Sequence, residues 1–107
     1  MSRHAATTDV FSTIADPTRR SLVDALAGGE QPVGKLASRF RVTLPAISQH
    51  LRLLREAGLV SVRAAGRQRF YRLVPAPLQE VSEWVQPFER FWRAKLDALG
   101  QHLEENP

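Results

Sequence analysis

The side chains best suited to binding chemistry are concentrated between residues 41 and 72. This stretch carries seven arginines and one acidic residue, Glu56, in a chain of formal net charge +4. Residues 1–40 carry five basic and four acidic side chains, and residues 73–107 carry three basic and six acidic ones. Guanidinium groups bind phosphate oxygens well, and a local excess of them attracts polyanions. The charge pattern alone fits a nucleic acid, an anionic membrane surface or a solvated basic face.

The segment from about residue 43 to 57 has the pattern of a helix with one small, polar face. Thr43 can cap its start and Gly58 can end it. At about 100° per residue, one face is apolar, with Leu44, Ile47, Leu51 and Leu54. The opposite face consists of Pro45, Ala46, Ser48, Gln49 and Arg52. Small residues let a helix approach base edges, and the polar ones can bond to bases or phosphates. The pattern fits a helix that reads a DNA major groove, and it also fits an ordinary solvated face.

Residues 60–73 are predicted to form a two-stranded hairpin. The stretch LVSVRA alternates apolar and polar residues, RFYRLV resumes strand character, and Ala65-Gly66 can form the turn. Val60, Val62, Tyr71 and Leu73 are expected to point inward, while the surface carries Arg63, Arg67, Arg69 and Arg72. An edge ribbon kept soluble by charge would look similar. Its position after a candidate reading helix favours a wing that contacts DNA.

Three shorter helices are expected to hold these parts in place. Val10, Phe11 and Ile14 form a first apolar cluster, and Asp16-Pro17 can cap and open a second helix that stops at Gly28-Gly29. Pro32 is expected to open a third helix, with Val33, Leu36, Ala37 and Phe40 on one side. The predicted fold class is mainly α with a small β-hairpin, a winged helix-turn-helix with N- and C-terminal dimerisation helices. No linker or internal repeat divides residues 1–107, so we expect one domain.

A long apolar stripe follows the hairpin. From Leu78 to Leu103, large apolar residues recur every three or four positions, which predicts a helix over about residues 77–104 with a kink or junction at Pro87. So many bulky positions exceed what a small domain covers by itself. We expect a homodimer interface made of Phe11, Trp84, Phe88, Phe91, Trp92, Leu96 and Leu99. The alternative is a helix that folds back on its own core.

Composition narrows the functional classes further. The chain has no cysteine, which excludes disulfides and thiolate metal sites. No apolar run approaches the ~20 residues that cross a bilayer, and the stretch MSRHAATTDVF lacks the apolar core of a secretion signal, so we expect a cytoplasmic protein without a membrane partner. Ser48, Gln49 and His50 are consecutive on one predicted helix and point in different directions, which argues against a catalytic triad. We expect no enzyme activity.

Together these segments resemble the ArsR-type (arsenic-repressor-like) winged helix-turn-helix repressors of prokaryotes. The resemblance spans roughly residues 8–105 and is carried by FSTIADPTRRSLVDAL, LPAISQHLRLLREAGLV and GRQRFYRLV. It implies a homodimer that binds a palindromic operator in double-stranded DNA, often near its own gene, and blocks transcription until a signal weakens the complex. It also implies a DNA-contacting set of Thr43, Pro45, Ala46, Ser48, Gln49 and Arg52, with Arg67, Gln68 and Arg69 at the wing tip.

The resemblance does not extend to the metal sites of that family. Its thiolate site lies at the start of the helix before the reading helix, where this chain has EQPVGKL, with Pro32 and Gly34 in place of ligands. A second family site pairs histidines and carboxylates on the dimer helix, but here that helix has one histidine, His102, with Glu105 nearby. Zinc prefers several such ligands at once, so we expect no metal and no cofactor. For His4 we expect a place in a tail, and for His50 a packed or phosphate-contacting role. A winged-helix module that binds protein or RNA remains the alternative function.

Overall fold

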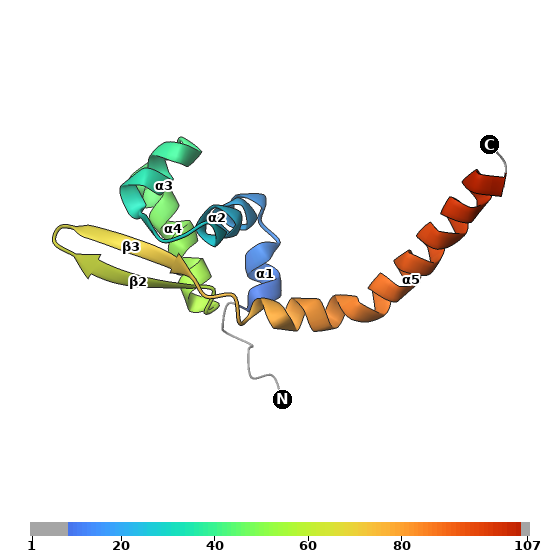
Figure 1. Ribbon diagram of the computed structural model, residues 1–107. Helices are drawn as coiled ribbons and strands as arrows, with labels where there is room; N and C mark the ends of the chain where they lie inside the picture. The colour runs from blue at the N-terminus through green and yellow to red at the C-terminus, as the bar shows by residue number, and fades with distance from the viewer. Residues whose placement is uncertain (1–8, 106–107) are drawn as a thin grey trace, which may run out of the picture.

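The computed structural model describes residues 9–105, which form a small helical body with a sheet on one side and a long helix on the other (Figure 1). In chain order the elements are α1 (Val10–Ile14), α2 (Pro17–Ala27), β1 (Gln31–Pro32), α3 (Val33–Phe40), α4 (Leu44–Glu56), β2 (Val60–Ala65), β3 (Gln68–Leu73) and α5 (Leu78–Glu105). The winged helix-turn-helix fold predicted from the sequence is confirmed.

The helices of the body begin where capping residues permit. The Asp16 carboxylate accepts a hydrogen bond from the Arg19 backbone N–H at 3.0 Å, with Pro17 opening α2. The hydroxyl oxygen of Thr43 accepts one from the Ala46 N–H at 3.2 Å at the start of α4. Such caps satisfy backbone donors that the first helical turn leaves unpaired. They fix where α4 starts, and therefore which of its side chains face outward.

The core lies where α2, α3, α4 and the sheet meet. The helices and the residue before β2 contribute fully buried side chains, which are Leu22, Leu36, Ile47, Leu51, Leu54 and Leu59, and the sheet contributes the buried Val60 and Tyr71. Three of them, Ile47, Leu51 and Leu54, are the inward face of α4 that the helical period predicts. Burial of each such side chain contributes about 1.5–3 kcal/mol, so α4 is held firmly in one rotation about its axis.

The sheet has three antiparallel strands in the order β1-β3-β2, and not the two that the sequence predicts. In the additional pair, Gln31 faces Tyr71 and Pro32 faces Phe70. As expected, Pro32 opens α3, of which it is the N-cap residue, and Pro32 belongs to β1 as well. A two-residue strand that contains a proline is too short to show any alternation, which explains why the pattern did not reveal it.

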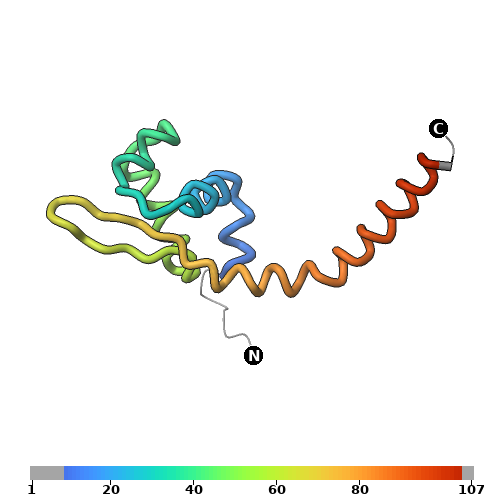
Figure 2. The backbone as a smooth tube through the Cα atoms, viewed as in Figure 1, coloured from blue at the N-terminus to red at the C-terminus, as the bar shows by residue number. Residues whose placement is uncertain are grey.

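α5 is a single helix of 28 residues that leaves the body instead of folding back on it. At 1.5 Å per residue it is about 42 Å long. Figure 2 traces it as a continuous rod that changes direction along its length. Pro87 lies inside it and removes one backbone hydrogen bond, so the predicted kink without a chain reversal is confirmed.

Candidate nucleic-acid interface

The outward side of α4 is open to solvent along its first three turns. Pro45, Ala46, Ser48 and Gln49 are all exposed, and they stand opposite the buried Ile47, Leu51 and Leu54. Together with Arg52 these residues form a surface that we call the reading face. No side chain longer than glutamine stands among its first four members. The backbone of α4 can therefore come close to a flat or grooved partner.

Arg52 completes the reading face but is already paired. Its Nη1 donates to Oε2 of Glu56 at 2.7 Å, one helical turn further along. Both side chains are exposed, and exposed pairs of this kind are worth about 0–1 kcal/mol. A phosphate or a guanine edge can therefore replace the Glu56 carboxylate at little energetic cost.

His50 does not belong to the reading face, because it packs against α2. Nη1 of Arg19 donates a hydrogen bond of 3.3 Å to Nδ1 of the half-buried ring. Because an arginine can only donate, Nδ1 is the acceptor. The Nε atom of the same arginine donates to the Thr13 carbonyl oxygen at 2.8 Å, at the end of α1. Arg19 thus joins α1, α2 and α4. The packed role expected for His50 is confirmed.

The wing, residues 60–73, carries its free cations at the tip. Gly66 makes the turn with a φ of 63°, a left-handed conformation that favours glycine. Arg67, Gln68 and Arg69 follow directly and are exposed. Val60 and Tyr71 are buried at the base of the wing, with Val62 and Leu73 partly buried, as the alternation predicts. Arg67 and Arg69 make the tip basic, and neither forms an ion pair with a carboxylate among residues 9–105.

The middle of the wing is held by an ion pair. Nε and Nη2 of Arg63 donate to the two carboxylate oxygens of Glu30 at 2.9 and 2.7 Å, and the guanidinium also lies 4.7 Å from the centre of the Phe70 ring. The guanidinium lowers the pKa of the Glu30 carboxyl below its ordinary value of 4.5. Arg72, on the neighbouring strand, donates weakly to the Ser61 hydroxyl oxygen at 3.4 Å. Arg63 therefore fixes the wing, and the tip arginines remain available for a partner.

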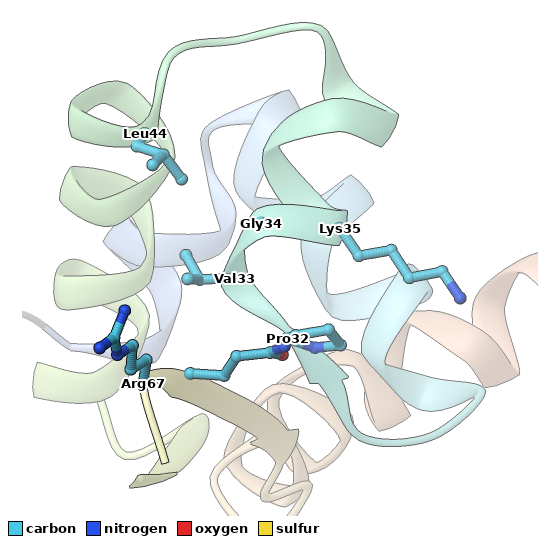
Figure 3. Close-up of a pocket in the computed structure, with 7 residues that line it drawn as sticks. Pro32, Val33, Gly34, Lys35, Leu44 and Arg67 are labelled. Atoms are coloured by element: carbon cyan, nitrogen blue, oxygen red, sulfur yellow. The ribbon is translucent and has the colours of Figure 1, made fainter. Parts of the chain in front are cut away.

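A groove of about 440 Å³ separates the wing tip from the helix-turn-helix (Figure 3). It is lined by Pro32, Val33, Gly34, Lys35, Leu44, Arg67 and Gln68. The prediction that Leu44 lies on the buried face of α4 is wrong, because its side chain is 53% exposed on the wall of this groove. Leu44 is the first residue of α4, where the helix projects beyond the core, and a helical period takes no account of helix ends.

The large apolar residues of α5 beyond its first turns are exposed. We call this set the apolar stripe, and its exposed fractions run from 48 to 65% for Trp84, Phe88, Phe91, Trp92, Leu96, Leu99 and Leu103. Only Leu78 and Val81 of α5 pack against the core, and the rings of Phe11 and Trp84 meet edge to face at 5.9 Å. The alternative in which α5 folds back on its own core is excluded for the described residues.

The described residues offer little else for chemistry. Among residues 9–105, no three His, Asp or Glu side chains lie close enough to hold a metal ion together. No helix in this part of the chain is long and apolar enough to cross a membrane. His4 lies outside the described residues. Leu44 and Lys35 are groove residues that sequence reasoning did not select, since neither stands out without knowledge of where the wing tip lies.

Comparisons with known proteins agree with this architecture. A helix-turn-helix domain family matches residues 14–63. An HTH-type transcriptional regulator of Mycobacterium tuberculosis is 38% identical over 104 residues, which cover 97% of this chain and 94% of the relative. The transcriptional repressor SdpR of Bacillus subtilis is 38% identical over 80 residues, 75% of this chain and 89% of the relative.

A solved structure of an ArsR family transcriptional regulator superimposes with a TM-score of 0.68 at 30% identity, covering 78% of this chain and 86% of the other. The relatives span nearly the same length as this chain, and the shared region includes the helix-turn-helix that presents the reading face. The chain therefore belongs to the ArsR family of DNA-binding, winged helix-turn-helix transcriptional regulators.

Proposed function

We propose that the protein is a homodimeric repressor that binds a palindromic operator and inserts α4 of each subunit into successive major grooves. The observation that carries this proposal is the reading face, which is small, polar and exposed while the opposite side of α4 is fully buried. A helix-turn-helix reads bases with residues near the start of its second helix, which is where these side chains lie. The relative SdpR, a transcriptional repressor, supports the direction of regulation.

The side chains of the reading face and wing tip have different roles, which follow from their chemistry. Gln49 and Ser48 can bond to base edges, and Pro45 and Ala46 allow close approach and apolar contact with a thymine methyl group. Thr43 lies at the cap of α4, where its hydroxyl can still donate to a phosphate while its oxygen accepts from Ala46. Arg52 leaves the Glu56 carboxylate and binds DNA in its place. At the wing tip Arg67, Gln68 and Arg69 contact the backbone beside the reading helix.

A second copy of the chain would cover the apolar stripe of α5. Seven large exposed residues along one helix are unfavourable in a monomer and typical of an interaction surface. Phe11 contacts Trp84 at 5.9 Å and so extends the surface to α1. A two-fold axis through this surface would present two reading faces, as a palindromic site requires.

The proposal is tested by footprinting the purified protein on the DNA upstream of its own reading frame, and by a selection from randomised duplexes. We expect protection of an inverted repeat, with affinity that falls steeply from about 50 to 200 mM salt because counterions are released from phosphates. Run-off transcription with and without the protein then tests repression. Binding of a protein partner or of RNA, with no duplex selected at low salt, would instead identify an interaction module and overturn the proposal.

A further inference from the structure

The groove between the wing tip and the helix-turn-helix is chemically distinct from the other hollows of the surface. Its seven lining residues include two cations, Lys35 and Arg67, and no carboxylate. Four other hollows of the described residues each include a carboxylate, from Glu30, Asp24 or Glu89. Of these five hollows, the groove is therefore the one whose charged residues best suit an anion.

The two cations of the groove have no acidic partner. Among residues 9–105, neither Lys35 nor Arg67 takes part in an ion pair, whereas Arg52 and Arg63 each do. Both side chains are exposed, and in Figure 3 they lie on opposite sides of Val33. Each of the two cations is therefore available to an anion on its own side of the groove.

Apart from its two cations, the lining of the groove is mainly apolar. Pro32, Val33 and Leu44 line it, and Leu44 is half exposed although the rest of the inward face of α4 is completely buried. A small inorganic anion gains nothing from apolar side chains. A sugar–phosphate chain matches both features, since its deoxyribose rings are largely apolar and its phosphates carry one charge each.

We infer that this groove seats one strand of the DNA backbone where it passes from the major groove read by α4 to the minor groove beside the wing. Lys35 binds a phosphate on the α3 side, Arg67 binds a phosphate on the wing side, and Leu44 contacts the deoxyribose between them. The inference rests on the proposed function, because it takes duplex DNA as the partner. It adds Lys35 and Leu44 to the DNA-contacting residues, and it means that the wing and α4 contact the same DNA strand.

The test uses the full chain and its selected duplex, with affinities measured from about 50 to 200 mM salt. Lys35→Gln should weaken binding several-fold at low salt on all sequences alike, and flatten the slope of log affinity against log salt by about one unit per subunit. Arg90→Gln removes the same charge two residues from both Phe88 and Trp92, on the opposite side of α5 from the apolar stripe, and should leave the slope unchanged.

Neutral methylphosphonates placed one at a time along the duplex then locate the contact. Lys35→Gln should lose sensitivity to a methylphosphonate at one position in each half-site, and Arg67→Gln at a neighbouring position on the same strand. Leu44→Ala should reduce affinity a few-fold with an unchanged salt slope, and Leu44→Glu should reduce it more than tenfold. Thermal unfolding of each variant at the wild-type temperature would show that the fold is intact.

The outcomes separate this inference from the function it rests on. If the wild-type protein selects an operator but Lys35→Gln keeps the full salt slope and couples to no phosphate, the groove does not hold the backbone and only this inference fails. Coupling of Lys35 and Arg67 to phosphates on different strands would also overturn it. A wild-type protein that binds no duplex would overturn both.

Discussion

Gln49 is the member of the reading face best able to distinguish one base from another. Its amide both donates and accepts, the pattern that matches the major-groove edge of adenine. Gln49→Ala should therefore relax sequence preference at one position of each half-site by about 1 to 3 kcal/mol. A randomised-site selection measures this directly, with Gln86→Ala on the far side of α5 as the control. A selected sequence identical to that of the wild type would remove Gln49 from the reading face.

The charge of Glu30 makes the stability of the fold depend on pH. Because Arg63 lowers the pKa of Glu30 in the folded protein below 4.5, the ion pair stabilises the fold at pH values above about 4.5. That contribution is lost as pH falls through the lowered pKa and Glu30 becomes protonated. Glu30→Gln should therefore be slightly less stable than the wild type at neutral pH, with the difference disappearing in acid.

Urea unfolding at pH 7 and at pH 3 checks the effect, and a double variant with Arg63→Gln tests its origin. If the pair is responsible, removing Arg63 as well should add little to the loss caused by Glu30→Gln, because the exposed pair acts as a unit. Equal losses at both pH values would show that Glu30 acts through something other than its charge.

Single residues could be predicted from the sequence where periodicity and capping decide their environment. Thr43, Ile47, Leu51 and Leu54 follow these local rules, and the structure confirms their positions. Leu44 and Lys35 depend on where the wing tip comes to lie, which is a long-range property of the fold. The Arg52–Glu56 pair follows an i, i+4 spacing that the sequence does contain, but the spacing does not say whether the arginine binds its neighbour or DNA.

At the level of elements, the proposed dimerisation depends on α5, because no described residue covers its apolar stripe. Trp92→Glu places a carboxylate in the middle of this surface, and burying it against a second copy should weaken dimerisation by about 2 to 4 kcal/mol. Analytical ultracentrifugation over a concentration series measures the change. Gln86→Glu, on the opposite side of α5, also adds one negative charge and provides a charge-matched control. A dimer of wild-type affinity would place the interface elsewhere on the molecule.

The elements themselves were largely predictable, with one instructive exception. Helices and the hairpin emerge from periods of 3.6 and 2 that extend over several residues. β1 has only two residues, and its pairing with β3 joins segments about 40 residues apart in the chain, which no local pattern contains. Pro87 could be identified as a point of bending, whereas the direction of the bend depends on contacts that no local rule contains.

At the scale of the whole molecule, the chain is elongated. Its radius of gyration is 18.5 Å, compared with about 13 Å for a compact domain of this length. Its extents are 63 × 41 × 20 Å, and most of the difference comes from α5. The sequence favours a helix that awaits a partner but cannot exclude one packed on its own body, because the apolar pattern of α5 fits both.

A paired molecule built through α5 should demand a fixed spacing between its half-sites. Inserting five base pairs at the centre of the palindrome turns one half-site by about half a helical turn, so that two reading faces can no longer bind together. Affinity should fall to that of a single half-site. Gel shifts with the same insertion placed outside the palindrome supply the control. Full binding to the spaced operator would indicate independent subunits.

The apolar stripe also makes the protein its own optical reporter. The chain has two tryptophans, Trp84 and Trp92, and both lie on α5, while α4 and the wing have none. Indole emission moves to shorter wavelength when water leaves its surroundings. When the light used for excitation is absorbed by indole and not by the phenol of Tyr71, the fluorescence of the unmodified protein therefore follows events on α5.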